Sequence, residues 1–186
     1  MSVVFAVIVA VAAWGVWIYN RLVALKNQVA NGWKQIDVQL KRRHDLIPNL
    51  VSAVRGYMEF ERDTLQRVIE ARGRAAGASG VRESVAAEAD LSRALRQLFA
   101  VAENYPQLRA NENVLRLQEE LTTTENQLGF ARQFYNDVVT RFNTQQDVFP
   151  ASLIAGYFGF QHAELFAAEA GDGAVPSVDL SLRPER

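Results

Sequence analysis

The residues with the richest chemistry form one polar run at positions 41–49, which reads KRRHDLIPN. Its first three residues are cations, and such a cluster suits acidic lipid or a phosphate group. His44 beside Asp45 is a pairing used in general acid–base catalysis, so the run could also serve a hydrolase or a lipid-acting enzyme. The alternative is a solvated helix end, where cations favour the helix dipole and Asp45 caps the following helix.

Two other sets of polar residues lie on predicted helices. Glu119, Glu120 and Glu125 are close together in the sequence. A solvated helix face, or pairing with arginines such as Arg42 or Arg116, explains them better than a carboxylate metal site. Asparagines are numerous for a helical protein, and we expect some to cap helices or to join them by hydrogen bonds. A polar recognition groove is the alternative role for these amides.

Sequence signatures of known catalytic and cofactor sites are missing. Neither His44 nor His162 follows a glutamate by three residues, as in di-iron bundles, and the chain has no cysteine for a zinc cluster. The glycines at 73–80 lack the Lys-Ser/Thr ending of a phosphate loop, and no nucleophile elbow or kinase signature occurs. The net charge of −1 offers no basic field for nucleic acid. We therefore expect no catalytic residues, cofactor, metal or nucleic-acid partner, and a protein that is not an enzyme.

An apolar run at the start of the chain must position these polar groups. Residues 3–19 read VVFAVIVAVAAWGVWIY, which makes a helix of about 25 Å at 1.5 Å per residue. This length is near the lower limit for crossing a hydrocarbon core about 30 Å thick. Trp14, Trp17 and Tyr19 cluster at one end, as aromatic residues do at a membrane interface. The alternatives fit less well, because a buried core helix would carry a polar face and a cleaved signal a basic start.

Positive charge predicts how this anchor is oriented. Arg21, Lys26 and Lys34 follow the apolar run, whereas no Lys or Arg precedes it. The positive-inside rule therefore places the bulk of the chain in the cytoplasm, at the inner membrane, with the N-terminus outside. The expected division of the chain is a transmembrane anchor at 1–21, a helical bundle at 22–169 and an irregular tail at 170–186.

Helical spacing of apolar residues dominates the rest of the chain, and alternating strand patterns are not evident, so we expect an all-α fold. The first helix should continue from the membrane to about Arg43, with a turn at 43–45 and a second helix that has Pro48 in its first turn. The glycine-rich segment 73–80 predicts a loop. The predicted architecture is an N-terminal transmembrane helix running into an antiparallel bundle of about four long helices.

Two long helices are expected after that loop. One, at 81–103, should end before Pro106, and the other, at 110–147, should end before Pro150. The apolar residues of the second of these alternate by three and four, which predicts a heptad seam. The seam residues are Val114, Leu117, Leu121, Thr124, Leu128, Ala131, Tyr135, Val138, Phe142, Gln145 and Phe149.

The segment 149–160, FPASLIAGYFGF, is too aromatic for a solvated loop and too short to cross a membrane. One interpretation is a last helical turn and loop that fold back and cap the open end of the bundle, together with Leu165 and Phe166. The alternative is an aromatic surface for a partner or for the lipid head-group region.

Several specific runs carry a family resemblance. They are QLKRRHDLIPNLV at 39–51, ENYP at 103–106, TEN at 124–126, YND at 135–137 and FGF at 158–160. With these runs the chain resembles the LemA family of bacterial membrane proteins, from the end of the anchor to near Phe166. The resemblance implies a short N-terminal anchor and a compact helical bundle, with no established reaction. A magnetosome-associated branch is also similar, which suggests membrane shaping or protein organisation.

The expected function is that of a single-pass membrane-anchored scaffold or interaction protein. It would bind the bilayer through its N-terminal helix, and unidentified membrane or cytoplasmic proteins, or copies of itself, through its bundle. The alternatives are a hydrolase or lipid-acting enzyme that uses residues 41–49, and a sensor domain with a bundle pocket for a small ligand. The candidate interaction residues are Lys41, Arg42, Arg43, His44, Asp45, Asn104, Tyr105, Phe158 and Phe160.

Overall fold

The computed structural model describes residues 1–58 and 60–166, and the tail predicted at 170–186 lies outside this part of the chain. The described residues form helices joined by short connections, without a strand, so the predicted all-α class is confirmed. The helices are α1 (Ser2–Arg55), α2 (Arg62–Gly77), α3 (Gly80–Ala102), α4 (Pro106–Arg109), α5 (Glu112–Asp147) and α6 (Ala151–Phe158).

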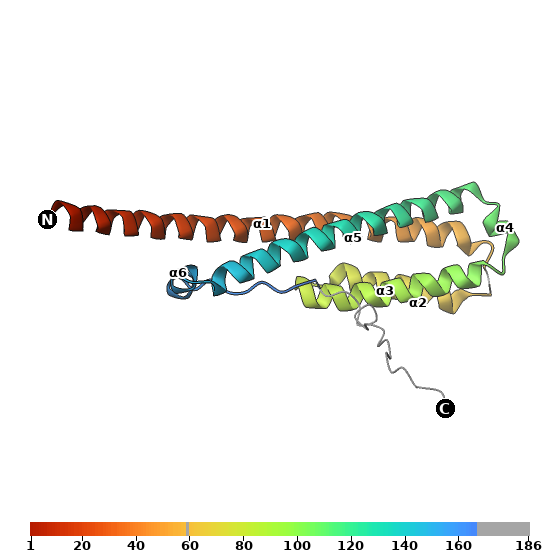
Figure 1. The fold of residues 1–186 in the computed structure, drawn as a ribbon. Coiled ribbons are helices and arrows are strands. Elements are labelled where there is room, and N and C mark those ends of the chain that lie inside the picture. Colours follow the sequence, from red (N-terminus) through yellow and green to blue (C-terminus); the bar gives the residue numbers. More distant parts are fainter. Residues whose placement is uncertain (59, 167–186) are drawn as a thin grey trace, which may run out of the picture.

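The two longest helices, α1 and α5, lie side by side and run in opposite directions (Figure 1). The shorter helices α2 and α3 form a second antiparallel pair, which packs on the C-terminal half of α1. Helix α4 connects α3 to α5 at the end of the molecule farthest from the N-terminus, and α6 folds back beside α1 nearer the other end. The predicted bundle of long antiparallel helices therefore consists of α1, α2, α3 and α5.

The N-terminal part of α1 projects beyond the other helices (Figure 1). Its apolar stretch has a mean hydropathy of 2.2, and 6% of it is buried by the rest of the described chain. A core helix would be covered by its neighbours, so this exposure argues against the core-helix interpretation. By length and composition the stretch can cross a membrane, and α1 continues without a break past position 21, the predicted end of the anchor.

The turn predicted at 43–45 is wrong, because α1 continues through Pro48 as one helix. Proline has no backbone N–H, so Pro48 leaves the carbonyl oxygen of His44 without its usual helical donor. The side chain of Arg72 on α2 supplies that donor, with its Nε 3.2 Å from the oxygen. Apolar residues stay buried at helical spacing on both sides of the proline, which keeps the helix packed. Asp45 therefore lies exposed within a helix and is not a cap.

The first reversal of the chain lies after α1, where Met58 is fully buried in the main apolar cluster. The loop predicted at 73–80 is shorter in the structure, because α2 continues to Gly77 and α3 already begins at Gly80. Gly80 has a φ of 78°, a conformation that favours glycine and lets the chain reverse within two residues. The bounds predicted for the third helix, 81–103, agree closely with those of α3.

Helix α5 begins and ends close to the predicted positions. Asn111 caps it, since its Oδ1 accepts hydrogen bonds from two backbone N–H groups at 3.0 and 3.2 Å. Most of the predicted seam is buried, but Gln145 and Phe149 are wrong, because Gln146 is buried instead and Phe149 is exposed. A helix with 3.6 residues per turn drifts relative to a strict heptad repeat, so the buried stripe shifts along a helix of this length.

After α6 the chain returns along α5, and two asparagines of α5 hold it there. Asn143 exchanges two hydrogen bonds with the backbone of Ala163, both of 2.9 Å. Asn136 does the same with the backbone of Phe166, at 2.8 and 2.9 Å. The fold-back predicted for the end of the chain and the burial of Phe166 are confirmed, whereas Leu165 is exposed and takes no part in the plug.

Candidate functional site

A buried arginine on α1 joins three helices. The helical spacing of α1 places Arg43 on the same face as the buried apolar residues that follow it. Its Nη1 lies 3.0 Å from Glu88 Oε2 on α3 and 3.2 Å from Glu125 Oε2 on α5. Its Nη2 donates to Ser92 Oγ on α3 at 2.9 Å. Arg43 thus ties α1 to two other helices with a fork of donors that a lysine would not reproduce.

Glu88 is the acidic centre of this buried cluster. It is 2% exposed, and its Oε1 lies 2.5 Å from His44 Nε2. A single carboxylate therefore contacts both Arg43 and His44. Asp45, the partner of His44 in the alternative hydrolase interpretation, is exposed, and that acid–base pair does not form. A carboxylate with both oxygens occupied by neighbours holds helices together and leaves a substrate no access. This geometry gives the hydrolase interpretation of residues 41–49 no support.

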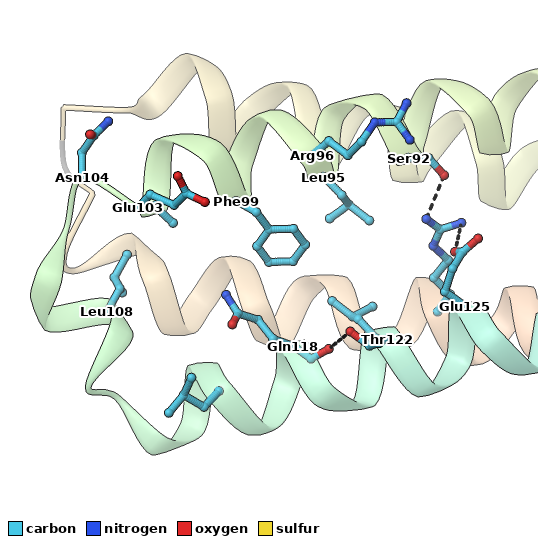
Figure 2. Close-up of a pocket in the computed structure, with 14 residues that line it drawn as sticks. Ser92, Leu95, Arg96, Phe99, Glu103, Asn104, Leu108, Gln118, Thr122 and Glu125 are labelled. Carbon is cyan, nitrogen blue, oxygen red and sulfur yellow. Dashed lines mark hydrogen bonds and ion pairs between the residues drawn. The ribbon is translucent and has the colours of Figure 1, made fainter. Parts of the chain in front are cut away.

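A groove of about 1170 Å³ opens between α3 and α5, next to this cluster (Figure 2). Leu95 and Phe99 on α3 point into it, and Gln118 and Thr122 lie on the α5 side. Its lining consists of Arg43, Ser92, Leu95, Arg96, Phe99, Ala102, Glu103, Asn104, Leu108, Leu115, Gln118, Leu121, Thr122 and Glu125.

The groove exists because α3 packs mainly on α2 and α5 packs mainly on α1, so that the backbones of α3 and α5 stay apart. Glu125 lies at one end, beside the arginine of the buried cluster, and Asn104 and Leu108 lie at the end nearest α4 (Figure 2). Leu115 is exposed along the α5 wall, and Phe99 is half-buried along the α3 wall. The result is an open channel whose lining mixes apolar side chains, such as Leu95 and Phe99, with polar ones, such as Gln118 and Thr122.

Comparison with known proteins identifies the family. The family model described as the LemA family matches residues 32–180. The chain belongs to the LemA family. This LemA-family chain is 23% identical over 150 residues to Protein LemA of Metamycoplasma hominis, which covers 80% of this chain and 68% of the relative. It is also 23% identical over 189 residues to the magnetosome proteins MamQ 1 and MamQ 2 of Paramagnetospirillum magneticum, covering 87% of this chain and 70% of each relative. The predicted family is confirmed, and none of these names denotes an enzymatic reaction.

Helix geometry divides the polar run of this LemA-family chain between two environments. Arg43 and His44 face the buried cluster, whereas Lys41, Arg42 and Asp45 are exposed on α1. Since 3.6 residues make one turn, five consecutive side chains of a helix cannot share one face. The run therefore acts as a structural junction on one side and as a charged surface on the other.

The other predicted interaction residues lie at the two ends of the bundle. Asn104 lines the groove near α4, and the neighbouring Tyr105 is half-buried. Phe158 and Phe160 lie near the apolar stretch of α1, where their ring centroids are 4.7 and 5.9 Å from that of Tyr19. In this LemA-family chain Arg43 and Asn104 thus line opposite ends of one groove, whereas Phe158 and Phe160 form a separate region beside Tyr19.

Sequence reasoning missed Glu88, the acidic centre of the buried cluster. Glu88 lies on the inward stripe of the third helix, and a charge at such a position requires a buried partner, which was the available signal. Glu125 pairs with Arg43 and not with Arg42, an expected partner, because the helix turns Arg42 toward solvent. No sequence feature predicted the groove, because the helix faces that form its walls have an ordinary amphipathic pattern.

Proposed function

We propose that this LemA-family protein is a membrane-anchored scaffold at the bacterial inner membrane, and that its bundle binds partner proteins in the groove between α3 and α5. The observation that carries the proposal is the groove, because two helices that a closed bundle would bring together stand apart there. Since α1 leads from the candidate membrane span to the groove without a flexible linker, the groove keeps a fixed relation to the anchor.

The continuity of α1 determines how far the groove lies from the membrane. Tyr19 ends the apolar stretch and Arg43 lines one end of the groove. Positions 19 and 43 are about 36 Å apart along one helix at 1.5 Å per residue. A partner bound in the groove would therefore be held at a defined height above the membrane interface, which is the task of a scaffold.

The lining of the groove favours a helical segment as the partner. Phe99 and Leu115 supply apolar surface that reaches solvent, above the buried Leu95. Gln118 and Thr122 add hydrogen-bonding groups along one wall (Figure 2). Amphipathic helices dock in grooves of this kind through apolar residues spaced three and four apart. Such a helix, from a membrane protein, a cytoplasmic protein or a second copy, would bridge α3 and α5.

Charge and relatives support the proposed location. Arg21, Lys26 and Lys34 follow the apolar stretch, and by the positive-inside rule they favour a cytoplasmic bundle. Two relatives are named as magnetosome proteins, which supports a membrane-associated role for this chain as well. Together these observations favour a bundle that works close to the inner face of the membrane.

Photocrosslinking at two adjacent threonines tests the proposal. Thr122 lines the groove, whereas Thr123 is exposed outside it. A benzophenone side chain at position 122 of the full-length protein should crosslink to a protein in native membranes, and one at position 123 should not. Phe99→Glu should abolish the crosslink from position 122, because it places a charge in the apolar part of the groove.

The experiment can also refute the proposal. Equal crosslinking yields from positions 122 and 123 would show that contact is not specific to the groove. A crosslink from position 122 that survives Phe99→Glu, in a variant with unchanged helix content by circular dichroism, would exclude the groove as the binding site.

A further inference from the structure

Helix α6 lies beside the last turns of the apolar stretch of α1. Ala151 and Ala155 are buried against Ile18 and Leu22. One turn nearer the N-terminus, a Cβ built on Gly15 would lie 3.9 Å from a side-chain atom of α6. Alanine and glycine at this contact let the two helices approach closely, so α6 is fixed at the level of residues 15–22 of α1.

The outward face of α6 is apolar and open to the surroundings. The helix reads ASLIAGYF and contains no charged residue. Leu153 is 65% exposed, Tyr157 85% and Phe158 57%, and the preceding Phe149 is exposed as well. A group of large apolar side chains on a surface indicates a contact with a membrane or with another protein.

The position of α6 on α1 indicates which contact this is. Residues that pack on the end of a membrane-spanning stretch share its depth, and here that depth is the interface between lipid and water. Trp17 and Tyr19 of α1 lie at the same level, and Tyr19 contacts the ring of Phe158. Aromatic side chains from two segments thus lie together at the level where membrane proteins concentrate Trp and Tyr, the interface between lipid and water.

Two cations lie just beyond this aromatic group. The guanidinium of Arg21 is 5.4 Å from the centroid of the Trp17 ring, and Lys26 Nζ is 6.0 Å from that of Phe160. Cations at this height suit the phosphates of lipid head groups. The order along α1 is therefore apolar, aromatic and then cationic, as expected on passing from lipid to water.

We propose that α6 is a second membrane-binding element of this protein, lying in the head-group region of the leaflet from which α1 emerges. Leu153, Tyr157 and Phe158 enter the boundary between head groups and acyl chains, where interfacial helices embed by about 5–10 Å. The occupant is lipid rather than a second copy, because α6 packs on the last turns of the apolar stretch of α1 and contains no charged residue to select a protein partner. The inference rests on the proposed insertion of α1 in the membrane.

Nitroxide accessibility in vesicles tests this inference, and the absence of cysteine from the chain makes single labelling sites simple to introduce. Full-length variants Tyr157→Cys, Ile8→Cys and Phe60→Cys are labelled and reconstituted in vesicles of phosphatidylcholine and phosphatidylglycerol. Ile8 reports the apolar stretch of α1, and the exposed Phe60 lies at the opposite end of the bundle. Labels at positions 157 and 8 should collide more often with oxygen than with a water-soluble nickel chelate, and the label at 60 should show the reverse.

Each other outcome overturns the inference in a distinct way. A lipid-exposed label at position 8 with a water-exposed label at 157 would refute the role of α6 and leave the anchor intact. Water exposure at both positions would refute the anchor itself. Spin–spin broadening at position 157 that grows with the protein-to-lipid ratio would show that a second copy covers α6. Leu153→Cys repeats the measurement on the same face, which guards against a local effect of labelling position 157.

Discussion

Replacement of Glu88 by glutamine is a direct test of the buried cluster. Glu88→Gln keeps the shape of the side chain but removes the negative charge that faces Arg43 and His44. Because Glu88 is 2% exposed, water cannot replace the lost charge. Arg43 then remains as a buried cation that has lost its buried counter-ion.

The expected loss of stability depends on the groups that still contact Arg43 in the variant. Breaking a buried ion pair by removing one partner destabilises a protein by about 3–5 kcal/mol. The lower end applies here, because Glu125 Oε2 still lies 3.2 Å from Nη1 and Ser92 Oγ still accepts from Nη2 at 2.9 Å. A loss of about 3 kcal/mol corresponds to a fall in Tm of roughly 6–12 °C for a chain of this size.

Unfolding of the full-length protein in mild detergent, by heat and by urea, measures this loss through far-ultraviolet circular dichroism. Asp90→Asn is the matched control, because Asp90 lies on the same helix and pairs with Arg93 at the surface. Exposed ion pairs contribute about 0.2–1 kcal/mol, so the control should unfold close to the wild type. A Glu88→Gln variant no less stable than the control would refute the conclusion that this carboxylate holds the helices together.

Two further predictions concern the hydrogen bond from Arg72 and the pKa of Tyr135. Arg72→Met removes the donor to the His44 carbonyl and should lower the free energy of unfolding by about 1–3 kcal/mol. In a Pro48→Ala background, which supplies a backbone N–H, urea unfolding should show a smaller loss of stability on replacing Arg72. If the effects of the two substitutions simply added, the Arg72 side chain would not be replacing the N–H that Pro48 lacks. Burial, and then the Glu164 carboxylate, raise the pKa of Tyr135 above its ordinary value of 10.0. Above about pH 10 the unfolded chain loses this proton while the folded chain keeps it, so the free energy of unfolding should fall. Tyr135→Phe should make that fall less steep in urea unfolding measured from about pH 9 upward. An unchanged dependence on pH in the variant would show that Tyr135 is not its source.

Features that depend on neighbouring residues were predictable from the sequence. Pro106 and Pro150 mark helix boundaries because proline and its preceding residue constrain the backbone locally. Asn111 caps α5 through backbone groups within three residues. The apolar spacing of 81–103 and 110–147 likewise predicted α3 and α5. The LemA resemblance added the overall class of fold but no site.

Features that depend on distant residues were not predictable in this way. The local rule for proline predicts a break near Pro48, and the helix persists because Arg72, on the next helix, satisfies the freed carbonyl. The polar run drew attention to His44 and Asp45, but the partner of His44 is Glu88 on α3. The groove depends on the spacing between α3 and α5, and spacing between helices leaves no mark in the sequence of either one.

Because α1 runs unbroken from the candidate membrane span into the bundle, a tilt of that span in a membrane would be transmitted to the bundle. Transmembrane helices tilt by about 20° on average, and their tilt responds to the thickness of the surrounding bilayer. The groove begins near Arg43. With an arm of about 36 Å, a change in tilt of about 10° moves that end of the groove sideways by roughly 6 Å. Thick and thin patches of lipid would then bring the bundle within reach of different neighbours.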